Sequence, residues 1–198
     1  MPLNRWTTYI NKNLFVNHGD FFELPYLSNN PKLMVESILK LPVSTHQESE
    51  QAIYTDNPFT KGVMRYRKVE EGLWLLASRL EVKQNIISKA LYDIEEKSDY
   101  YFLSFSVFEY QFFVNPHQRD SATLLSTTCT FYKPRTEVTT YFYEDTMGIF
   151  YNLVFNKEWA EKNLVFNAAY EKKEIKETLN NKSVFINWLD IVPDAANL

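Results

Sequence analysis

An aromatic stretch from Asp99 to Asn156 constrains the fold of this chain more than any other feature. It holds half of the 15 Phe, 13 Tyr and 4 Trp residues in the sequence. Its first run, residues 100–110, alternates so that two sets of side chains would occupy opposite faces of a strand. One face would carry the odd positions Tyr101, Leu103, Phe105 and Val107, and the other the even positions Phe102, Ser104, Ser106 and Phe108. We therefore expect β-structure with an apolar interior.

Further strand-like runs follow at residues 122–131, 138–143 and 149–155. The segments between them contain Pro116, Pro134 and Gly148, residues typical of turns. Two earlier runs, 63–69 and 73–82, also have strand character, whereas residues 83–98 fit a helix or a bent strand. Several short strands separated by turns predict a β-sandwich or barrel rather than a parallel α/β sheet.

Residues 1–60 differ from this centre and form a predicted N-terminal arm with a helix. Residues 5–14 have weak helical spacing of apolar positions. A stronger helix begins at the N-cap residue Asn30, with Pro31 in the first turn, and Pro42 ends it. Polar residues 44–51 then predict an exposed loop.

The C-terminal region, residues 166–198, is predicted to be a helical linker that follows the 61–165 β-domain. Asn156 can cap a short helix that reaches Leu164, and a second helix is expected over about 168–180. A short strand is favoured at 184–191. The last six residues, from Pro193, resemble the first turn of another helix, which leads us to expect that the chain is part of a longer protein.

Composition narrows the functional classes. The chain has 198 residues, which suits one domain with an appendage, and a formal net charge of −4 without a basic stripe, which disfavours direct DNA binding. Only 4 Gly occur, and no glycine-rich phosphate loop exists. The lone Cys129 predicts a buried thiol, and no apolar run is long enough for a membrane span. We expect a cytoplasmic protein that does not contact membranes.

Catalytic motifs are not evident. The three histidines, His18, His46 and His117, do not form a metal-binding pattern, and no C-x-x-C occurs, so neither a metal nor another cofactor is expected. Neither a His117–Asp120 pair nor a Cys129–His117 pair is favoured as a catalytic arrangement. Carboxylates at strand ends are ordinarily exposed to solvent, and this is the simplest interpretation of Glu109, Glu137 and Glu144. We therefore expect that the chain is not an enzyme.

The aromatic residues instead predict a ligand pocket inside a barrel, with tyrosine hydroxyls as fixed polar points. Simple core packing is the alternative for each aromatic residue, and a solvated surface position is the alternative for the one arginine. The predicted ligand-binding residues are Trp74, Arg79, Tyr101, Phe105, Tyr141 and Tyr143.

Three segments together resemble the N-terminal sensor domain of AraC-type transcription regulators: Glu71 to Leu76 (EGLWLL), Gly148 to Phe150 (GIF) and Leu153 to Trp159 (LVFNKEW). The resemblance covers residues 60–165 and consists of hydrophobic placement. It implies a cupin-like or jelly-roll β-barrel that binds a small effector, followed by helices that dimerise. A DNA-binding part would follow in such regulators, and this sequence contains none.

The leading hypothesis is therefore an effector-binding and dimerisation domain of a transcription regulator. It would form a homodimer and would contact DNA only through a separate C-terminal domain. Two alternatives stay open. One is a metal-independent cupin-like or lipocalin-like enzyme, with Glu109, Glu137 or His117 inside the barrel. The other is a carrier or oligomerisation module.

Overall fold

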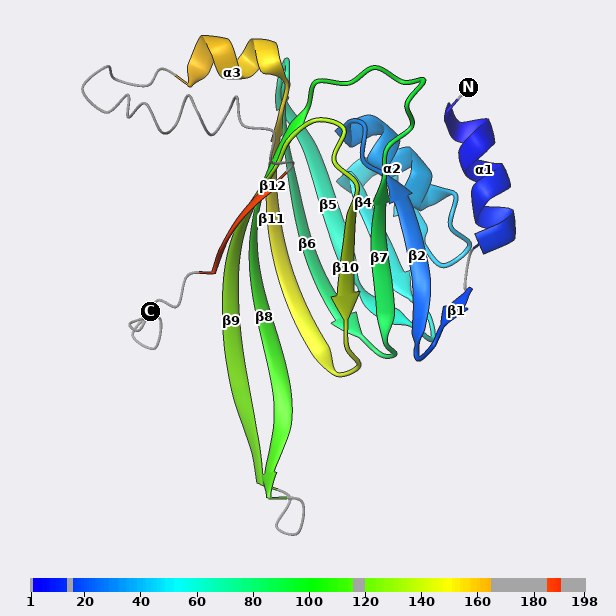
Figure 1. Cartoon of the computed structure of the whole chain (residues 1–198), viewed down its shortest axis with the longest axis vertical. Helices are drawn as coiled ribbons and strands as arrows, with labels where there is room; N and C mark the ends of the chain where they lie inside the picture. The colour runs from blue at the N-terminus through cyan, green and yellow to red at the C-terminus, as the bar shows by residue number, and fades with distance from the viewer. Residues whose placement is uncertain (1, 14–15, 116–119, 165–184, 190–198) are drawn as a thin grey trace, which may run out of the picture.

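The computed structural model describes residues 2–13, 16–115, 120–164 and 185–189, and its helices and strands are shown in Figure 1. The helices are α1 (Pro2–Asn13), α2 (Pro31–Leu39) and α3 (Lys157–Asn163), with a 3-10 turn at Glu48–Glu50. The strands are β1 (Asn17–His18), β2 (Phe21–Leu27), β3 (Thr45–Gln47), β4 (Ala52–Asp56), β5 (Thr60–Glu70), β6 (Leu73–Val82), β7 (Ile86–Leu91), β8 (Tyr101–Asn115), β9 (Asp120–Tyr132), β10 (Val138–Phe142), β11 (Thr146–Phe155) and β12 (Phe185–Leu189).

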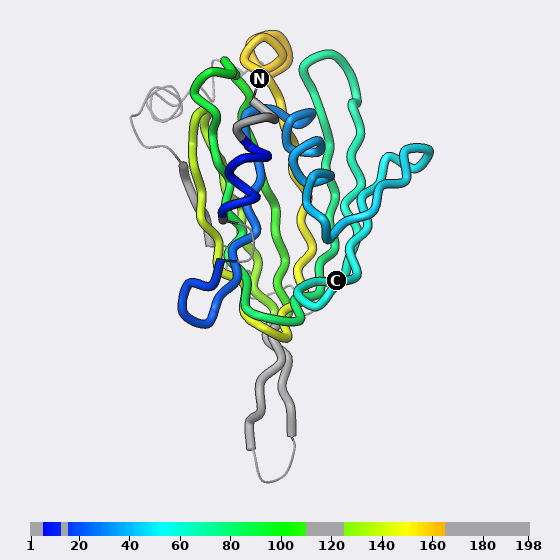
Figure 2. The backbone as a smooth tube through the Cα atoms, turned by 90° about the vertical axis from the view of Figure 1, so that its right-hand side faces the viewer, coloured from blue at the N-terminus to red at the C-terminus, as the bar shows by residue number. Residues whose placement is uncertain are grey.

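The strands form two sheets. The larger sheet has eight strands in the order β12-β9-β8-β11-β6-β5-β4-β3, and all of its pairings are antiparallel. The smaller sheet has the order β1-β2-β7-β10, in which β2 and β7 run parallel. Helices α1 and α2 lie over the outer side of the smaller sheet (Figures 1 and 2). The β8–β9 hairpin extends beyond both sheets, because residues 111–115 and 120–123 of these strands pair only with each other.

The prediction of a mainly β fold is confirmed, but the described strands form two sheets and do not close into a barrel. The sheets meet where consecutive strands separate, between β6 and β7 and between β10 and β11. There a backbone hydrogen bond from the Asp145 N–H to the Val82 carbonyl (2.9 Å) joins the two turns. It is not part of the regular pairing between two strands. The long-range parallel pairing of β2 with β7 could not be read from the local pattern, since the two strands are more than 50 residues apart.

The segment before the boundary predicted at residue 60 contributes strands to both sheets. It supplies β1 and β2 to the smaller sheet and β3 and β4 to the larger one. The polar segment 44–51 was predicted to be a loop, whereas residues 45–47 form the edge strand β3 and the remainder lies exposed. The ambiguous segment 83–98 contains strand β7.

Both predicted helix caps are confirmed. Asn30 has an extended backbone and its Oδ1 accepts a hydrogen bond from the Leu33 N–H (2.9 Å), with Pro31 in the first helical position. Asn156 caps α3 in the same way, through the Trp159 N–H (2.8 Å). Strand β12 falls within the strand predicted at 184–191, whereas the helices predicted at 168–180 and from Pro193 lie outside the described residues.

Two apolar clusters stabilise the structure. The first lies between the helices and the outer side of the smaller sheet and is made by Trp6, Ile10, Leu27, Leu33 and Leu41. The second lies between the sheets at one end and is made by Val82, Ile86 and Phe142, with Leu24, Phe59, Leu80, Phe108 and Phe150 packed against them. The second cluster establishes that the two sheets face each other.

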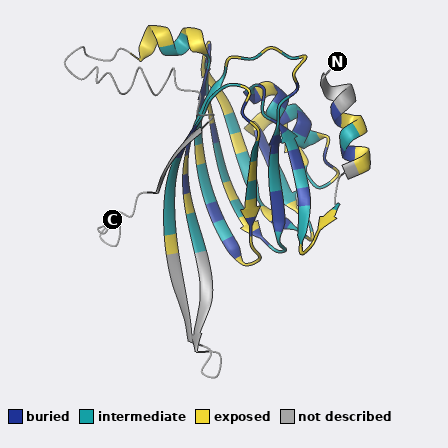
Figure 3. Cartoon of the chain, in the orientation of Figure 1, coloured by how far each residue is buried: buried dark blue, intermediate teal, exposed yellow. Residues whose placement is uncertain are grey.

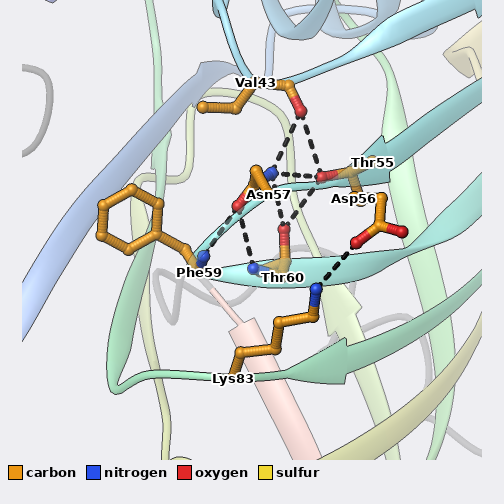
Figure 4. Close-up of polar contacts among 7 residues, drawn as sticks. All are labelled: Val43, Thr55, Asp56, Asn57, Phe59, Thr60 and Lys83. Atoms are coloured by element: carbon orange, nitrogen blue, oxygen red, sulfur yellow. Dashed lines mark hydrogen bonds and ion pairs between the residues drawn. The ribbon is translucent and has the colours of Figure 1, made fainter.

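A polar network fixes the turn between β4 and β5 (Figure 4). The Asn57 carboxamide oxygen accepts hydrogen bonds from the backbone N–H groups of Phe59 (2.8 Å) and Thr60 (2.9 Å). Its Nδ2 donates to the Val43 carbonyl at 3.0 Å. Asn57 therefore positions Phe59, whose ring contacts the Phe22 ring of β2 at a centroid distance of 4.9 Å.

We expect Asn57→Ala to lower the free energy of unfolding by about 1–2 kcal/mol, because it leaves the partly buried N–H groups of Phe59 and Thr60 without their acceptor and removes one of two donors to the Val43 carbonyl. Urea unfolding followed by circular dichroism measures the loss. Lys83→Ala is the control in the same region, since it removes only the exposed ion pair with Asp56 (2.7 Å) and should change stability little. Equal losses for the two variants would contradict the role assigned to Asn57.

Candidate ligand site between the two sheets

Strand alternation identifies the side chains that point between the sheets. Leu24 of β2, Phe108 of β8 and Phe150 of β11 pack against the cluster between the sheets, so their faces of these strands point inward. Because side chains alternate along a strand, every second residue from these positions also points inward. The inward side of the larger sheet is therefore the even-numbered face of β6, β8 and β11.

The interior has an apolar end and a polar end. The apolar end is the cluster around Phe142, where the rings of Phe108, Phe142 and Phe150 lie 5.3–5.9 Å from one another. Toward the other end, the inward positions carry hydroxyl and amide groups beside Phe102 and Trp74. These polar inward residues are Tyr26, Ser88, Ser104, Ser106, Thr130, Tyr132 and Asn152.

Burial along β2 shows that the interior is less densely filled than the helix-covered side. The residues of β2 that face α1 and α2, Glu23, Pro25 and Leu27, are all buried. The alternate residues, which point between the sheets, remain half-buried (Figure 3). Native cores are close-packed, and a side chain there rarely keeps accessible surface. The inward side of β2 is thus less fully covered than its helix-facing side.

The two tyrosines at the polar end remain protonated over the physiological range. Burial raises the pKa of the Tyr26 hydroxyl strongly, and the nearby Tyr132 adds to this effect, although a hydrogen bond with Ser88 opposes it. Burial also raises the pKa of Tyr132, again opposed by a hydrogen bond, from Thr130. Protonated hydroxyls can both donate and accept hydrogen bonds, so each tyrosine can orient a polar group of a ligand.

These raised pKa values predict an alkaline loss of stability. A pKa raised in the folded state contributes stability that is present below the unfolded value, about 10, and is lost as the pH rises through the folded value. The free energy of unfolding should therefore fall above about pH 10. We expect a shallower fall for Tyr26→Phe, measured by urea unfolding at a series of pH values, and an unchanged slope would contradict the burial of this hydroxyl.

The interior also favours an uncharged ligand. No charged residue occupies the inward positions of β2, β6, β7, β8 and β11, and Lys68 of β5, which lies opposite Trp74, is exposed and paired with Glu71. A charged ligand without a counter-charge would incur a large desolvation cost there. Aromatic rings and hydroxyl groups suit a neutral aromatic or alicyclic molecule that carries a few hydrogen-bonding groups.

The structure distributes the six sequence-predicted site residues over three surfaces. Trp74 points inward, next to the polar end. Arg79, Tyr101 and Phe105 lie on the outer face of the larger sheet, where Arg79 contacts the Met147 sulfur (3.5 Å). Tyr101 stacks between Phe131 and Phe155, each at a centroid distance of 5.7 Å.

The other two predicted residues, Tyr141 and Tyr143, lie with Phe21 on the outer side of the smaller sheet, at ring distances of 5.4 Å, and both are more than half exposed. Only Trp74 of the six is therefore on the inward face. The residues missed were the serines of β8 and the tyrosines of β2 and β9. The sequence signal that could have identified them is Ser104-x-Ser106 between Phe102 and Phe108. Two serines on an otherwise aromatic face of a strand indicate an interior that contains polar groups.

The predicted catalytic alternatives do not lie between the sheets in the described structure. Glu109 belongs to the outer face of β8, and exposed Glu137 accepts a hydrogen bond from the Tyr92 N–H (3.2 Å). Cys129 lies on the outer face of β9 and is half-buried. His117 lies outside the described residues. Within the described ranges, no three His, Cys, Asp or Glu side chains gather where they could hold a metal ion.

An open groove of about 620 Å³ is a second concavity, on the outer face of the larger sheet beside β5. Arg65 and Arg67 face Glu48 and Glu50 across it, above the apolar Leu75. Glu50 is already engaged by the Tyr54 hydroxyl and by Gln47 (2.7 Å). The groove is mixed in charge and exposed to solvent, so it is a weaker ligand site than the interior.

A buried carboxylate, which the sequence did not reveal, joins α1 to the smaller sheet. Glu23 is 4% exposed and accepts hydrogen bonds from the Tyr9 hydroxyl (2.8 Å) and the Lys89 ammonium (3.5 Å), with His18 at 3.2 Å. Burial raises the pKa of Tyr9, and Glu23 adds to this. Burial alone would lower the pKa of Lys89, but Tyr9 and Glu23 outweigh it and raise the pKa. These groups satisfy one another and lie on the side of β2 opposite the interior.

Comparison with family models, with curated proteins and with solved structures found no match. No helix in the described part of the chain is both long and apolar enough to cross a membrane. The function must therefore be argued from the geometry of the two sheets and from the residues between them.

Proposed function

We propose that this protein binds a small neutral ligand between its two sheets. The observation that carries the proposal is the contrast along β2, where residues facing the helices are buried and residues facing the other sheet keep accessible surface. A ligand that fills this space would bury apolar area against Phe22, Leu24 and Trp74. Its polar groups would meet the hydroxyls of Tyr26 and Tyr132.

We further propose that ligand binding serves sensing rather than catalysis, as in the effector domains that the sequence resembles. The inward positions of β2, β6, β7, β8 and β11 supply hydrogen-bonding groups but no histidine or carboxylate for acid–base chemistry. His46 shares this face of the larger sheet but lies on the edge strand β3, where it is exposed and contacts the Tyr66 hydroxyl (2.6 Å). The cupin-like or jelly-roll arrangement implied by the resemblance, and a role in transcription regulation through a separate DNA-binding part, remain part of this proposal.

The position of β2 suggests how binding would be transmitted. Its inward side would contact the ligand, while its outer side contacts α1 through Glu23 and Tyr9 and α2 through the Leu27 N–H, which donates to the Ser37 hydroxyl (2.9 Å). A ligand that favours one position of β2 would therefore favour one position of the helices. It can shift this equilibrium only by the difference between its affinities for the two arrangements.

Binding can be tested with naphthol, a neutral aromatic alcohol, by fluorescence titration and calorimetry. Asn152→Trp places a large side chain on the inward face of β11 and should abolish binding. Tyr151→Trp is the matched control on the outer face of the same strand and should leave binding unchanged. Tyr26→Phe should weaken binding by roughly fivefold, the effect of one hydrogen bond of about 1 kcal/mol.

If Asn152→Trp does not fold, Ser88→Leu replaces it, since this residue lies on the inward face of the opposite sheet. Folding of each variant is checked by circular dichroism. Saturable binding that survives both inward substitutions would contradict the proposed site. Failure of naphthol, indole and cyclohexanol all to bind the wild-type protein would contradict the proposed function itself.

A further inference from the structure

Strand β10 forms a free edge of the smaller sheet. The strand order of that sheet ends with β10, which pairs with β7 from Val138 to Phe142. In the part of the chain that the structure describes, no second strand pairs with β10. Every second residue of an antiparallel edge strand turns its N–H and C=O groups away from its one neighbour. Strand β10 therefore presents a row of backbone donors and acceptors to which another strand could bond.

This edge lacks the features that usually prevent an exposed strand from pairing with another chain. Its sequence, Val-Thr-Thr-Tyr-Phe, contains residue types that favour strands and has no charge or proline. Its pairs with β7 continue in one register without a bulge. The opposite edge of the same sheet differs, since β1 has only two residues and Pro25 of β2 has no N–H group. Of these two edges, β10 is thus the one suited to pairing.

Aromatic side chains held in fixed positions stand beside the free edge. Tyr141 of β10 is 56% exposed, and Tyr143, which follows the strand, is 58% exposed. Phe21 contacts both rings edge to face, each at a centroid distance of 5.4 Å. Exposed tyrosines are frequent anchors of protein interfaces, because they bury a large area and lose little conformational freedom. On a sheet they would contact the side chains of an added strand at alternate positions.

The side chains on the inward side of the edge set a second preference. Val138 and Thr140 are half-buried there, next to the buried Phe142. Residues of an added strand that point the same way would lie beside these apolar and hydroxyl groups. A partner strand should therefore carry valine-like or threonine-like residues on this side and larger apolar residues on the tyrosine side.

Charge distinguishes the two ends of the edge. Exposed Arg135 and Glu137 precede β10 and offset each other. Exposed Glu144 and Asp145 follow it, and within the described ranges neither carboxylate forms an ion pair. A basic residue of a partner strand would find its counter-charge only at this second end. Complementary charges at the rim of an interface fix its register and orientation.

We propose that the free edge of β10 binds an extended peptide segment of a partner protein as an added strand. The segment runs antiparallel to β10, the slightly more stable pairing, so its N-terminal end lies at Glu144 and Asp145 and carries a basic residue. Apolar side chains at alternate positions contact Tyr141 and Tyr143. Backbone hydrogen bonds supply the affinity and these side-chain contacts supply the specificity, as is general for strand addition.

The test uses the full chain and the synthetic peptide KKTVTFTV, blocked at both ends, with binding measured by calorimetry. Binding should be saturable. Amide hydrogen exchange should then slow at alternate residues of β10, those whose N–H groups do not bond to β7. Contact with the tyrosine rings alone would not produce this period of two. The same peptide with N-methyl groups on every threonine and valine should not bind, because it cannot donate backbone hydrogen bonds.

Protein variants test the side-chain contacts and the orientation. Tyr141→Ala should weaken binding roughly tenfold, and Tyr151→Ala, the matched exposed tyrosine of the larger sheet, should leave it unchanged. Glu144→Lys should weaken binding of KKTVTFTV roughly two- to fivefold and strengthen binding of EETVTFTV by a similar factor. Glu158→Lys, on the exposed surface of α3, is the control for charge reversal. Circular dichroism establishes that each variant folds.

Several results would overturn the inference. One is the absence of KKTVTFTV binding up to about 1 mM, and another is equal binding of the N-methylated peptide. A third is protection of all β10 amides in the free protein, which would mean that the edge is already paired. Equal losses for Tyr141→Ala and Tyr151→Ala would also overturn it. Naphthol binding should be unchanged in Tyr141→Ala, so failure here is distinguishable from failure of the proposed function.

Discussion

Phe142→Ala should lower the free energy of unfolding by about 3–5 kcal/mol, the cost of removing a large buried aromatic side chain. Phe142 is 8% exposed and lies between Phe108 and Phe150 in the cluster that joins the two sheets. The substitution would leave a cavity in this cluster, and the cavity would weaken the contact between the two sheets. Chemical unfolding, monitored by near-ultraviolet and far-ultraviolet circular dichroism, measures the loss.

The neighbouring residue gives a sharp control for this prediction. Tyr141 has an aromatic ring of similar size but points to the outer side of β10, where it is 56% exposed. Tyr141→Ala should therefore cost less than about 1 kcal/mol. Similar losses for the two variants would mean that the inward and outward faces of the smaller sheet have been assigned incorrectly, and the interior site would lose its basis.

Glu23→Ala should destabilise the protein by about 2–3 kcal/mol. The substitution leaves the Tyr9 hydroxyl and the Lys89 ammonium without their shared acceptor beneath α1. Removing one partner of a fully buried pair costs about 3–5 kcal/mol, and the partial exposure of Lys89 and His18 reduces that figure. Amide hydrogen exchange should show the largest loss of protection in α1, because Tyr9 joins this helix to the sheet.

Glu36→Ala is the matched control for Glu23→Ala. It removes a partly exposed glutamate that pairs with exposed Lys32 one helical turn away, at 3.9 Å. Such a pair contributes about 0.3–0.5 kcal/mol. Glu23→Gln should fall between the two glutamate-to-alanine variants, since it retains an acceptor but loses the charge. Equal stability of Glu23→Ala and the wild-type protein would show that the buried carboxylate does not hold α1 in place.

The features that the sequence predicted well are local. The Asn30 and Asn156 caps depend on side-chain bonds to residues three positions away, and both formed as expected. The weak helix over 5–14 corresponds to α1, where Trp6 and Ile10 are buried. Alternation in residues 100–110 identified strand β8 and separated its two faces correctly.

Choosing the inward face of β8 required tertiary information. Both faces carry aromatic residues, so hydrophobicity did not separate them, and the odd face with Tyr101 and Phe105 was expected inside. The register with β11 places the serine-containing even face inside instead. The interior tolerates Ser104 and Ser106 because they lie near the hydroxyls of β9, such as Thr130. Sequence alone does not show which strand will be the neighbour.

Strand β2 could not be predicted for a different reason. It contains Pro25, which has no N–H group and usually marks an interruption or an edge of a sheet. In the structure, β1 pairs with β2 only at Phe21 and Phe22, so β2 has an unpaired side at Pro25. The proline is therefore compatible with the strand. Without β2, neither Glu23 nor Tyr26 could be assigned a role from the sequence.

The central claim is that the space between the sheets receives a small neutral ligand. Protein-observed nuclear magnetic resonance during a naphthol titration tests it most directly, because amide shifts locate the bound molecule. The account predicts saturable shifts that centre on Tyr26, Ser88 and Asn152. Shifts confined to the exposed aromatic residues Tyr141 and Tyr143, or to the groove around Arg65, would contradict it.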